Sequence, residues 1–435
     1  MRVYFHTLGC KVNYADTQGM MALFQQKGFE ISEDVGEADV VVMNTCAVTE
    51  TAEKEARQVL RRFRNRAPNA LFVLTGCLAH LPSVKALQQD VQVVIGNQEK
   101  KESAELVLQA LQKTGAHSGK VLVKPIREER TFPMLPEGEY PARTRRFLKI
   151  QDGCSRFCTF CIVPYVRGKE RSLPPAEVLR ILNRWAQEDV PEVVLAGIHL
   201  TAYGWDLKPR TSLAELVGQI SQRNFPFRVR LSSLEPQDLR EDLISAVAEG
   251  YPRICPHFHL PLQSGSDEVL RRMKRGYTVE DYRGKLEKIR QCIPNAEIST
   301  DIIVGFPGET ENDFHETLKC VQSLDFVRVH AFPYSPRKGT PASEWPQVPV
   351  EEKRMRQKAL LQLVRQMWEK KAIRTIGQKF EVIAESPFPA LPGSYEGYTE
   401  NYFPALVPAF RKGEKVQALC VGYTAHHLIL ERRGN

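Results

Sequence analysis

Apolar residues in the first 115 positions form short runs separated by amphipathic stretches. The runs at 40–43 and 71–74 are almost entirely apolar, which is typical of strands buried on both faces of a parallel sheet. Shorter strand patterns occur at 3–8 and 91–96, and the intervening stretches repeat apolar residues every three or four positions, as helices on a sheet do. This order predicts a doubly wound α/β domain with a flavodoxin-like sheet over residues 1–115.

A second series of strands and helices begins at residue 144. Six strand patterns, each followed by a helical stretch, occur at 147–150, 193–196, 229–232, 257–260, 298–304 and 327–332. They predict a partial TIM-type (β/α)6 barrel over 144–375 that ends in a basic amphipathic helix at 351–375. The proline- and glycine-rich residues 116–143 predict a linker, and the period-two pattern of 376–435 predicts a small antiparallel β-barrel.

Composition limits the class of protein. The chain has 435 residues, ten cysteines and a net charge of +8. It lacks an apolar run of the length that a membrane span needs, so we expect a cytoplasmic protein without membrane contact, whose cysteines are thiols or metal ligands. The positive charge is clustered, which suits a polyanion such as RNA but is equally typical of solvated helix faces.

Three cysteines in one short loop are the strongest chemical signal. Cys154, Cys158 and Cys161 follow the first barrel strand with the spacing C-x3-C-x2-C. A structural zinc site would need a fourth ligand, and no fourth cysteine lies nearby. An iron–sulfur cubane is usually held by four thiolates, so a cluster held by three leaves one iron open to a small molecule.

Three further cysteines fall just past the ends of predicted parallel strands. Cys10, Cys46 and Cys77 follow the first, second and third apolar runs. Carboxyl ends of parallel strands meet at one sheet edge, so these thiols are expected to converge on a second cluster; the alternative is three separate buried thiols. Cys255, Cys292, Cys320 and Cys420 show no such pattern and are interpreted as packing thiols.

These features together resemble a known family. The loop spacing, with Phe160 before the third cysteine, is similar to the cluster loop of radical S-adenosylmethionine (SAM) enzymes, and 397–402 resembles a TRAM domain, a β module associated with RNA binding. The whole chain resembles the radical SAM methylthiotransferases. Residues 7–13, with Lys11 directly after Cys10, resemble the branch that acts on N6-threonylcarbamoyladenosine beside the tRNA anticodon.

The resemblance implies cofactors and a reaction. Cys154, Cys158 and Cys161 would hold a [4Fe–4S] cluster that binds and cleaves SAM, and Cys10, Cys46 and Cys77 would hold an auxiliary [4Fe–4S] cluster that carries sulfur. The implied product is 2-methylthio-N6-threonylcarbamoyladenosine at tRNA position 37. The implied partners are tRNA, a low-potential electron donor such as flavodoxin or ferredoxin, and a sulfur source.

Other candidate residues lie at strand ends and in basic clusters. The expected cofactor-binding set is Phe160, Gly197, Ser233, Glu235, Gln263, Asp301 and Val304. The expected RNA-binding set is Arg143, Arg145, Arg146, Arg271, Arg272, Tyr398 and Tyr402. His199, His257 and His259 are interpreted as hydrogen-bonded rather than metal-binding. Three alternatives remain open: methylthiolation of isopentenyladenosine in tRNA, methylthiolation of a ribosomal protein side chain, and a non-enzymatic iron–sulfur protein that binds RNA.

Overall fold

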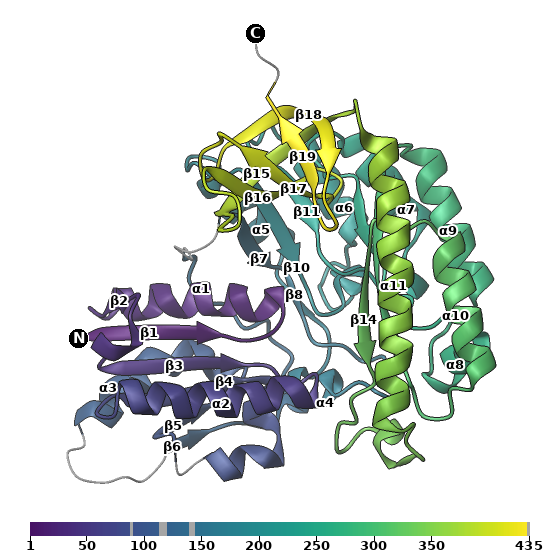
Figure 1. The fold of residues 1–435 in the computed structure, drawn as a ribbon. Helices are drawn as coiled ribbons and strands as arrows, with labels where there is room; N and C mark the ends of the chain where they lie inside the picture. Colours follow the sequence, from purple (N-terminus) through teal and green to yellow (C-terminus); the bar gives the residue numbers. More distant parts are fainter. Residues whose placement is uncertain (88–89, 113–119, 139–143, 433–435) are drawn as a thin grey trace.

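The computed structural model describes residues 1–87, 90–112, 120–138 and 144–432, which form three parts (Figure 1). A parallel sheet with its helices makes up the N-terminal part, a partial barrel the middle, and a small closed barrel the C-terminal part. In the described part of the chain, no helix combines the length and hydropathy needed to cross a membrane.

The N-terminal part is a six-stranded parallel sheet in the order β2-β1-β3-β4-β5-β6, which confirms the flavodoxin-like prediction. The strands are β1 (Arg2–Thr7), β2 (Glu30–Ser32), β3 (Val40–Thr45), β4 (Leu71–Gly76), β5 (Val93–Ile95) and β6 (Lys120–Leu122). The helices are α1 (Lys11–Gln26), α2 (Glu50–Arg66) and α3 (Ser103–Gln112). Every residue of β3 is buried, as the apolar run predicts. The last strand, β6, lies within the residues expected to form a linker and pairs with β5.

The middle part consists of two three-stranded sheets, ordered β11-β10-β7 and β12-β13-β14, joined by parallel bridges from Val229 to Ile254 and from Ser233 to His259. Its strands are β7 (Arg146–Lys149), β10 (Glu192–Ala196), β11 (Arg228–Leu231), β12 (His257–His259), β13 (Glu297–Val304) and β14 (Arg328–Pro333). The helices are α4 (Val163–Arg167), α5 (Pro175–Trp185), α6 (Leu213–Ser221), α7 (Glu241–Gly250), α8 (Asp267–Arg272), α9 (Val279–Cys292) and α10 (Glu311–Ser323). All paired strands within these two sheets are parallel, as predicted for a partial barrel.

The two faces of the barrel strands differ in polarity. Outward residues such as Leu195, Leu231 and Ile298 are fully buried in the core under the surrounding helices. The inward positions carry polar and charged side chains, among them Glu192, Arg230, His257, Ser299 and Asp301. Because successive side chains alternate across a strand, this pattern lines the barrel interior with polar groups.

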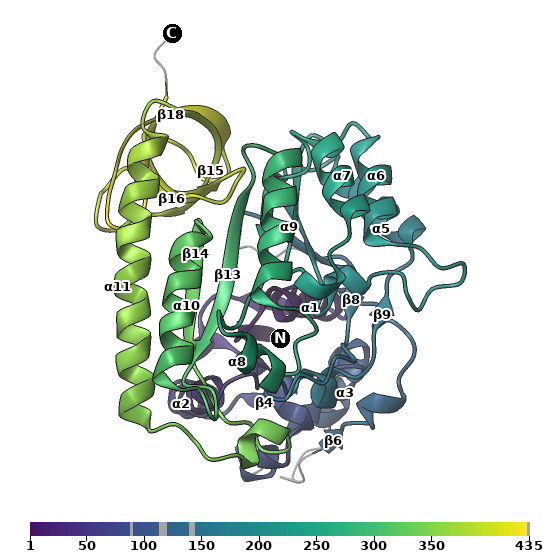
Figure 2. The same ribbon diagram turned by 90° about the vertical axis from the view of Figure 1, so that its right-hand side faces the viewer.

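The C-terminal part follows the long helix α11 (Val350–Thr375), which packs along β14 and α10 (Figure 2). Its barrel closes in the order β15-β16-β17-β19-β18. The strands are β15 (Lys379–Pro387), β16 (Ser394–Thr399), β17 (Pro404–Pro408), β18 (Lys415–Tyr423) and β19 (Leu428–Glu431). Pairing is antiparallel except between β17 and β19, which run parallel over two residue pairs and close the barrel.

The N-terminal part docks on the middle part through buried ions. Asp16 of α1 pairs with Lys100 (2.6 Å) and with Lys149 of β7. Arg167 of α4 reaches both Asp16 (3.4 Å) and Asp152 (3.1 Å), and these side chains are almost fully buried. Because several cations surround Asp16 and outweigh its burial, they lower its pKa to about 2. The two parts are therefore held together by charges that are costly to separate.

Candidate functional site

The first cysteine group lies on the loop between β8 (Gln151–Asp152) and α4. Cys158 is buried and Cys154 and Cys161 are half-buried, and the Cys161 amide donates to the Cys158 carbonyl (3.0 Å). Burial raises the pKa of Cys161, and the neighbouring Cys158 thiol raises it further. Three thiolates here would repel one another without a cation between them, which is the donor set that a metal cluster requires.

The second cysteine group lies at the carboxyl edge of the N-terminal sheet, where Cys10, Cys46 and Cys77 follow β1, β3 and β4. Gly76 has a φ of 95°, and a Cβ at this position would lie 2.3 Å from the Thr45 carbonyl, so glycine allows Cys77 to approach the Cys46 strand. Burial, followed by the charges of Cys77 and Cys10, raises the pKa of Cys46 to about 12. The three thiols therefore converge on one site.

The donor sets at both sites fit the iron–sulfur clusters expected from the sequence. All ten cysteines are free thiols, so none of the six is committed to a disulfide. Each group supplies three soft sulfur donors, and the fourth iron of a cubane bound there would have no cysteine ligand from the same group.

Residues around the first group hold its loop in place. The His199 Nε2 lies 2.8 Å from Asp238, and its Nδ1 lies 3.9 Å from the Cys154 Sγ. Glu170 accepts hydrogen bonds from the Ser155 amide and hydroxyl, both at 2.6 Å. Burial alone would lower the pKa of His199, but its hydrogen bonds to Asp238, Cys154 and Glu170 raise it to about 11.

The ligand atoms of Cys154, Glu170 and His199 all lie within 4.8 Å of one another, a separation at which a metal ion could be held. The hydrogen bonds of His199 and Glu170 agree with the sequence interpretation of a hydrogen-bonded histidine. Sequence reasoning did not find their role in supporting the loop. The feature of the sequence that could have indicated this role is the position of His199 just after the end of β10.

Arg275 is a second functional candidate, which sequence reasoning missed because it lies within a basic cluster. Its guanidinium lies 3.5 Å from the Cys158 Sγ and 2.6 Å from the Glu235 carboxylate. Arg271, four residues earlier, is exposed and pairs with Glu268 on its own helix. The cluster of positive residues at 271–275 therefore divides into a buried cation at the cysteine loop and a solvated helix face.

The expected cofactor-binding residues lie along the carboxyl rim and the interior of the barrel. Glu235 is linked through Arg275 to Cys158, and Ser233 bridges to His259, which lies 3.1 Å from Asp301. The backbone N–H of Gln263 donates to the backbone carbonyl of Asp301 (2.8 Å). The others are placed at the ends of their strands or on the cysteine loop: Phe160 packs edge-on against Phe306, the Gly197 amide donates to the Ser232 hydroxyl, and Val304 ends β13.

The expected RNA-binding residues are not brought together. Arg145 is buried between Glu192 and Glu385, and Arg146 pairs with Glu188 and covers Trp185. Arg271 and Arg272 lie on α8, and Arg143 lies outside the described residues. The set therefore does not form one continuous surface.

Tyr398 and Tyr402 lie where the C-terminal barrel meets the middle barrel. Tyr402 stacks on His257 of β12 with ring centroids 4.2 Å apart, and Tyr398 stacks on Tyr402 at 4.7 Å. Arg230 covers Tyr402, and Arg328 donates to the Tyr398 hydroxyl (2.9 Å). These tyrosines therefore form part of the wall of the barrel interior.

A cavity of about 520 Å³ lies where β14, α11 and the C-terminal barrel meet. Its wall combines the aromatic rings of Phe332, Trp368 and Tyr398 with the cationic side chains of Arg328 and Arg365. Phe332 is 44% exposed, so an aromatic face is available to a stacking partner. Aromatic rings and arginines in one groove are the chemistry that binds unpaired nucleotides.

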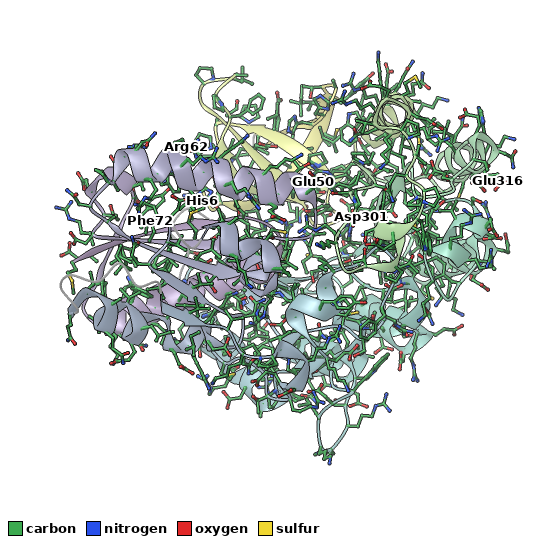
Figure 3. All side chains as sticks on the ribbon, turned by 90° about the horizontal axis from the view of Figure 1, so that it is seen from below. His6, Glu50, Arg62, Phe72, Asp301 and Glu316 are labelled. Carbon is green, nitrogen blue, oxygen red and sulfur yellow. The ribbon has the colours of Figure 1, made fainter. Side chains whose placement is uncertain are left out.

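The two cysteine groups face a common region between the first two parts of the chain. Arg167, from the helix after Cys161, lies 3.4 Å from the Cys77 Sγ. On another side, the α2 N-terminus meets the loop after β14, where the Glu50 amide donates to the Ser335 hydroxyl (2.8 Å). Figure 3 shows Glu50 on the side of the N-terminal part that faces Asp301 of the barrel.

Comparison with known proteins identifies the family to which a chain with these two cysteine groups belongs. Residues 148–321 match the model of the radical SAM superfamily, and residues 2–96 match that of the uncharacterized protein family UPF0004. Over 97% of its length the chain is 36% identical to the threonylcarbamoyladenosine tRNA methylthiotransferase MtaB of Bacillus subtilis, of which it covers 94%. The chain belongs to the tRNA methylthiotransferase family.

Two further comparisons bear on this methylthiotransferase. A tRNA-2-methylthio-N(6)-dimethylallyladenosine synthase of Dictyoglomus thermophilum is 37% identical over 92% of this chain, and the match covers 91% of that relative. The radical SAM methyltransferase TsrM of Kitasatospora setae, 14% identical, shares the fold with a TM-score of 0.57, covering 79% of this chain and 77% of TsrM. The cofactors of this methylthiotransferase are SAM and [4Fe–4S] clusters, and the chain is an enzyme that transfers methylthio groups.

Proposed function

We propose that this methylthiotransferase modifies carbon 2 of N6-threonylcarbamoyladenosine at position 37 of tRNA. The observation that carries the proposal is the position of Lys11, which directly follows Cys10 and whose charge acts on Asp301, His330 and Tyr402. The charge of the residue beside one cysteine group thus acts on side chains of the barrel interior. A base placed there would be accessible from both sites.

The six cysteines divide into two roles under this proposal. Cys154, Cys158 and Cys161 would hold the cluster that binds SAM, and Cys10, Cys46 and Cys77 would hold the cluster that carries sulfur. When bound, these groups supply radical chemistry at carbon 2 and the methylthio group itself. The chain's own contribution is position: Arg275 holds Cys158 and Glu235 together, and His199 and Glu170 hold the Cys154 loop.

The substrate RNA would reach the interior through the cavity beside β14. Its aromatic and cationic wall suits a base splayed from a single-stranded loop, and an anticodon loop presents such bases. The electron donor is expected to be a flavodoxin or ferredoxin, and a separate sulfur source would replenish the second site.

The direct test compares tRNA nucleosides by mass spectrometry in cells with and without the protein. The proposal predicts that 2-methylthio-N6-threonylcarbamoyladenosine disappears and that unmodified N6-threonylcarbamoyladenosine accumulates. Loss of the methylthio derivative of isopentenyladenosine instead would assign the activity named for the Dictyoglomus relative. Reconstituted enzyme incubated with ribosomes would show whether a protein side chain gains the same mass.

A further inference from the structure

Lys11 is placed at the junction of all three parts of the chain. It is the first residue of α1 and is half-buried. Residues three apart share a helix face, and Tyr14 on that face packs its ring 6.2 Å from Phe147, an inward residue of β7. The Lys11 side chain therefore projects on the side of α1 that faces the barrel interior.

The charge of Lys11 affects the pKa values of three side chains that lie on separate segments of the chain. Burial raises the pKa of Tyr402, but nearby cations lower it overall, and Lys11 has the largest effect among them. Lys11 also contributes to lowering the pKa of His330 on β14 and of Asp301 on β13, where burial and neighbouring charges act as well. Tyr402 belongs to the C-terminal barrel, His330 to β14 and Asp301 to β13, so the charge of Lys11 acts on groups from both barrels.

Two other cations of this region are already paired with a carboxylate. Arg145 and Arg230 pair with the fully buried Glu192, and Arg328 donates to the Tyr398 hydroxyl. Within residues 1–87, 90–112, 120–138 and 144–432, Lys11 forms no ion pair with a carboxylate, and Asp301 contacts His259 (3.1 Å). Lys11 is thus a half-buried cation that can still accept an anionic partner.

We propose that Lys11 binds the threonyl carboxylate of N6-threonylcarbamoyladenosine and so selects it against isopentenyladenosine. The inference rests on the proposed function and identifies the residue that reads the N6 substituent. The two nucleosides differ at this substituent, because the threonylcarbamoyl group ends in a carboxylate and the isopentenyl group is an uncharged hydrocarbon. A half-buried ammonium without an ion-pair partner among the described residues attracts the first and gains nothing from the second.

The test measures binding rather than turnover. Three anticodon stem-loop RNAs carry N6-threonylcarbamoyladenosine, its threonyl methyl ester or isopentenyladenosine, and affinity for the reconstituted holoenzyme is measured by fluorescence anisotropy without SAM. The wild-type protein should bind the acid about tenfold or more tightly than the ester, as expected for a charge-assisted contact. In Lys11→Gln this ratio should fall to near one, with affinity for the ester unchanged.

Two further variants keep the result interpretable. Lys11→Arg retains the charge and should retain most of the preference for the acid. Lys27→Gln removes a lysine just beyond the other end of α1, where it pairs with the exposed Glu105, and should leave the ratio unchanged. Because Lys11 has no ion-pair partner in the described part of the chain, its replacement leaves none of the described buried carboxylates unpaired, and the fold should be kept.

The outcomes separate the inference from the function on which it rests. A Lys11→Gln protein that keeps the wild-type preference for the acid over the ester would overturn the role of Lys11 while leaving the proposed function intact. A wild-type protein that methylthiolates only the isopentenyladenosine RNA would overturn the proposed function, and the assigned role of Lys11 with it.

Discussion

The guanidinium of Arg167 lies 3.4 Å from the sulfur of Cys77, measured from Nε to Sγ. Arg167 belongs to the helix that follows the Cys154–Cys161 loop, and Cys77 belongs to the N-terminal sheet. The same guanidinium reaches Asp16 and Asp152 and is fully buried. One side chain thus connects the helix after the first cysteine group with Cys77 of the second group and with the buried ion pairs between the two parts.

Replacing Arg167 with leucine should destabilise the protein by about 3–5 kcal/mol, because it leaves the buried carboxylates of Asp16 and Asp152 with fewer cations. Urea unfolding followed by circular dichroism measures the loss. Arg271→Leu is the matched control, since its partner Glu268 is exposed and its removal should change stability little. Equal effects of the two substitutions would contradict the structural role of Arg167.

Glu192 should anchor the C-terminal barrel through three arginines. Its fully buried carboxylate contacts Arg145, Arg228 and Arg230, and the last two donate to backbone carbonyls of 381, 398, 399 and 400. Glu192→Gln keeps the shape but removes the carboxylate that these three arginines share, leaving Arg145 with Glu385 and Arg228 with Glu381, so we expect a loss of about 3–5 kcal/mol. Hydrogen exchange should rise across residues 379–431.

The control for this interface is Glu188→Gln, which removes the partly exposed partner of Arg146. Exchange in the C-terminal barrel should not change in this variant. If Glu192→Gln also left exchange at 379–431 unchanged, the carboxylate would have no part in holding the two barrels together.

His80 should make stability depend on pH between 6.5 and 4. Its Nε2 accepts a hydrogen bond from the backbone N–H of Asn97 (2.9 Å), and burial followed by nearby Lys100 and Arg167 lowers its pKa to about 4. Since the unfolded chain takes up the proton first, stability is complete above pH 6.5 and is lost as pH falls toward 4. We expect His80 to account for a loss on the order of 2 kcal/mol, after allowance for its partial exposure.

The measurement compares unfolding free energies of wild type and His80→Gln at intervals from pH 7 to pH 4. Glutamine can accept the same hydrogen bond but does not titrate, so its curve should fall less steeply. Other histidines with a lowered pKa, such as the half-buried His330, act equally in both proteins and cancel in the difference. Parallel curves for the two proteins would show that His80 is not the group responsible.

Local patterns in the sequence predicted the fold and the two cysteine groups. The apolar runs of β3 and β4 gave buried parallel strands, and this topology alone brings Cys46 and Cys77 to one edge. The one parallel pair in the C-terminal barrel, β17 with β19, was not predicted, because strand direction in a closed barrel depends on how its ends meet.

Contacts between distant segments could not be predicted in the same way. Arg145 and Tyr402 were expected at an RNA surface, but Glu192 and Glu385 engage Arg145, and Tyr402 stacks on His257, which lies 145 positions earlier in the chain. The buried Arg275 and the exposed Arg271 have the same composition signal and differ only in what the fold places beside them. Whether a charged side chain can be buried depends on its ion-pair partner, and a local sequence pattern cannot identify a partner that is distant in the chain.

The most direct test of the account is to count clusters in wild-type protein and in Cys46→Ala prepared without oxygen, using iron analysis, Mössbauer spectroscopy and the products formed with SAM and RNA. Wild type should contain two [4Fe–4S] clusters, or about eight iron atoms per chain. Cys46→Ala should keep one cluster and still form 5′-deoxyadenosine, but transfer no methylthio group, whereas Cys154→Ala should lose SAM cleavage. Methylthio transfer by a Cys46→Ala protein with a single cluster, or zinc in place of iron in the wild type, would contradict the assignment of two separate cysteine sites.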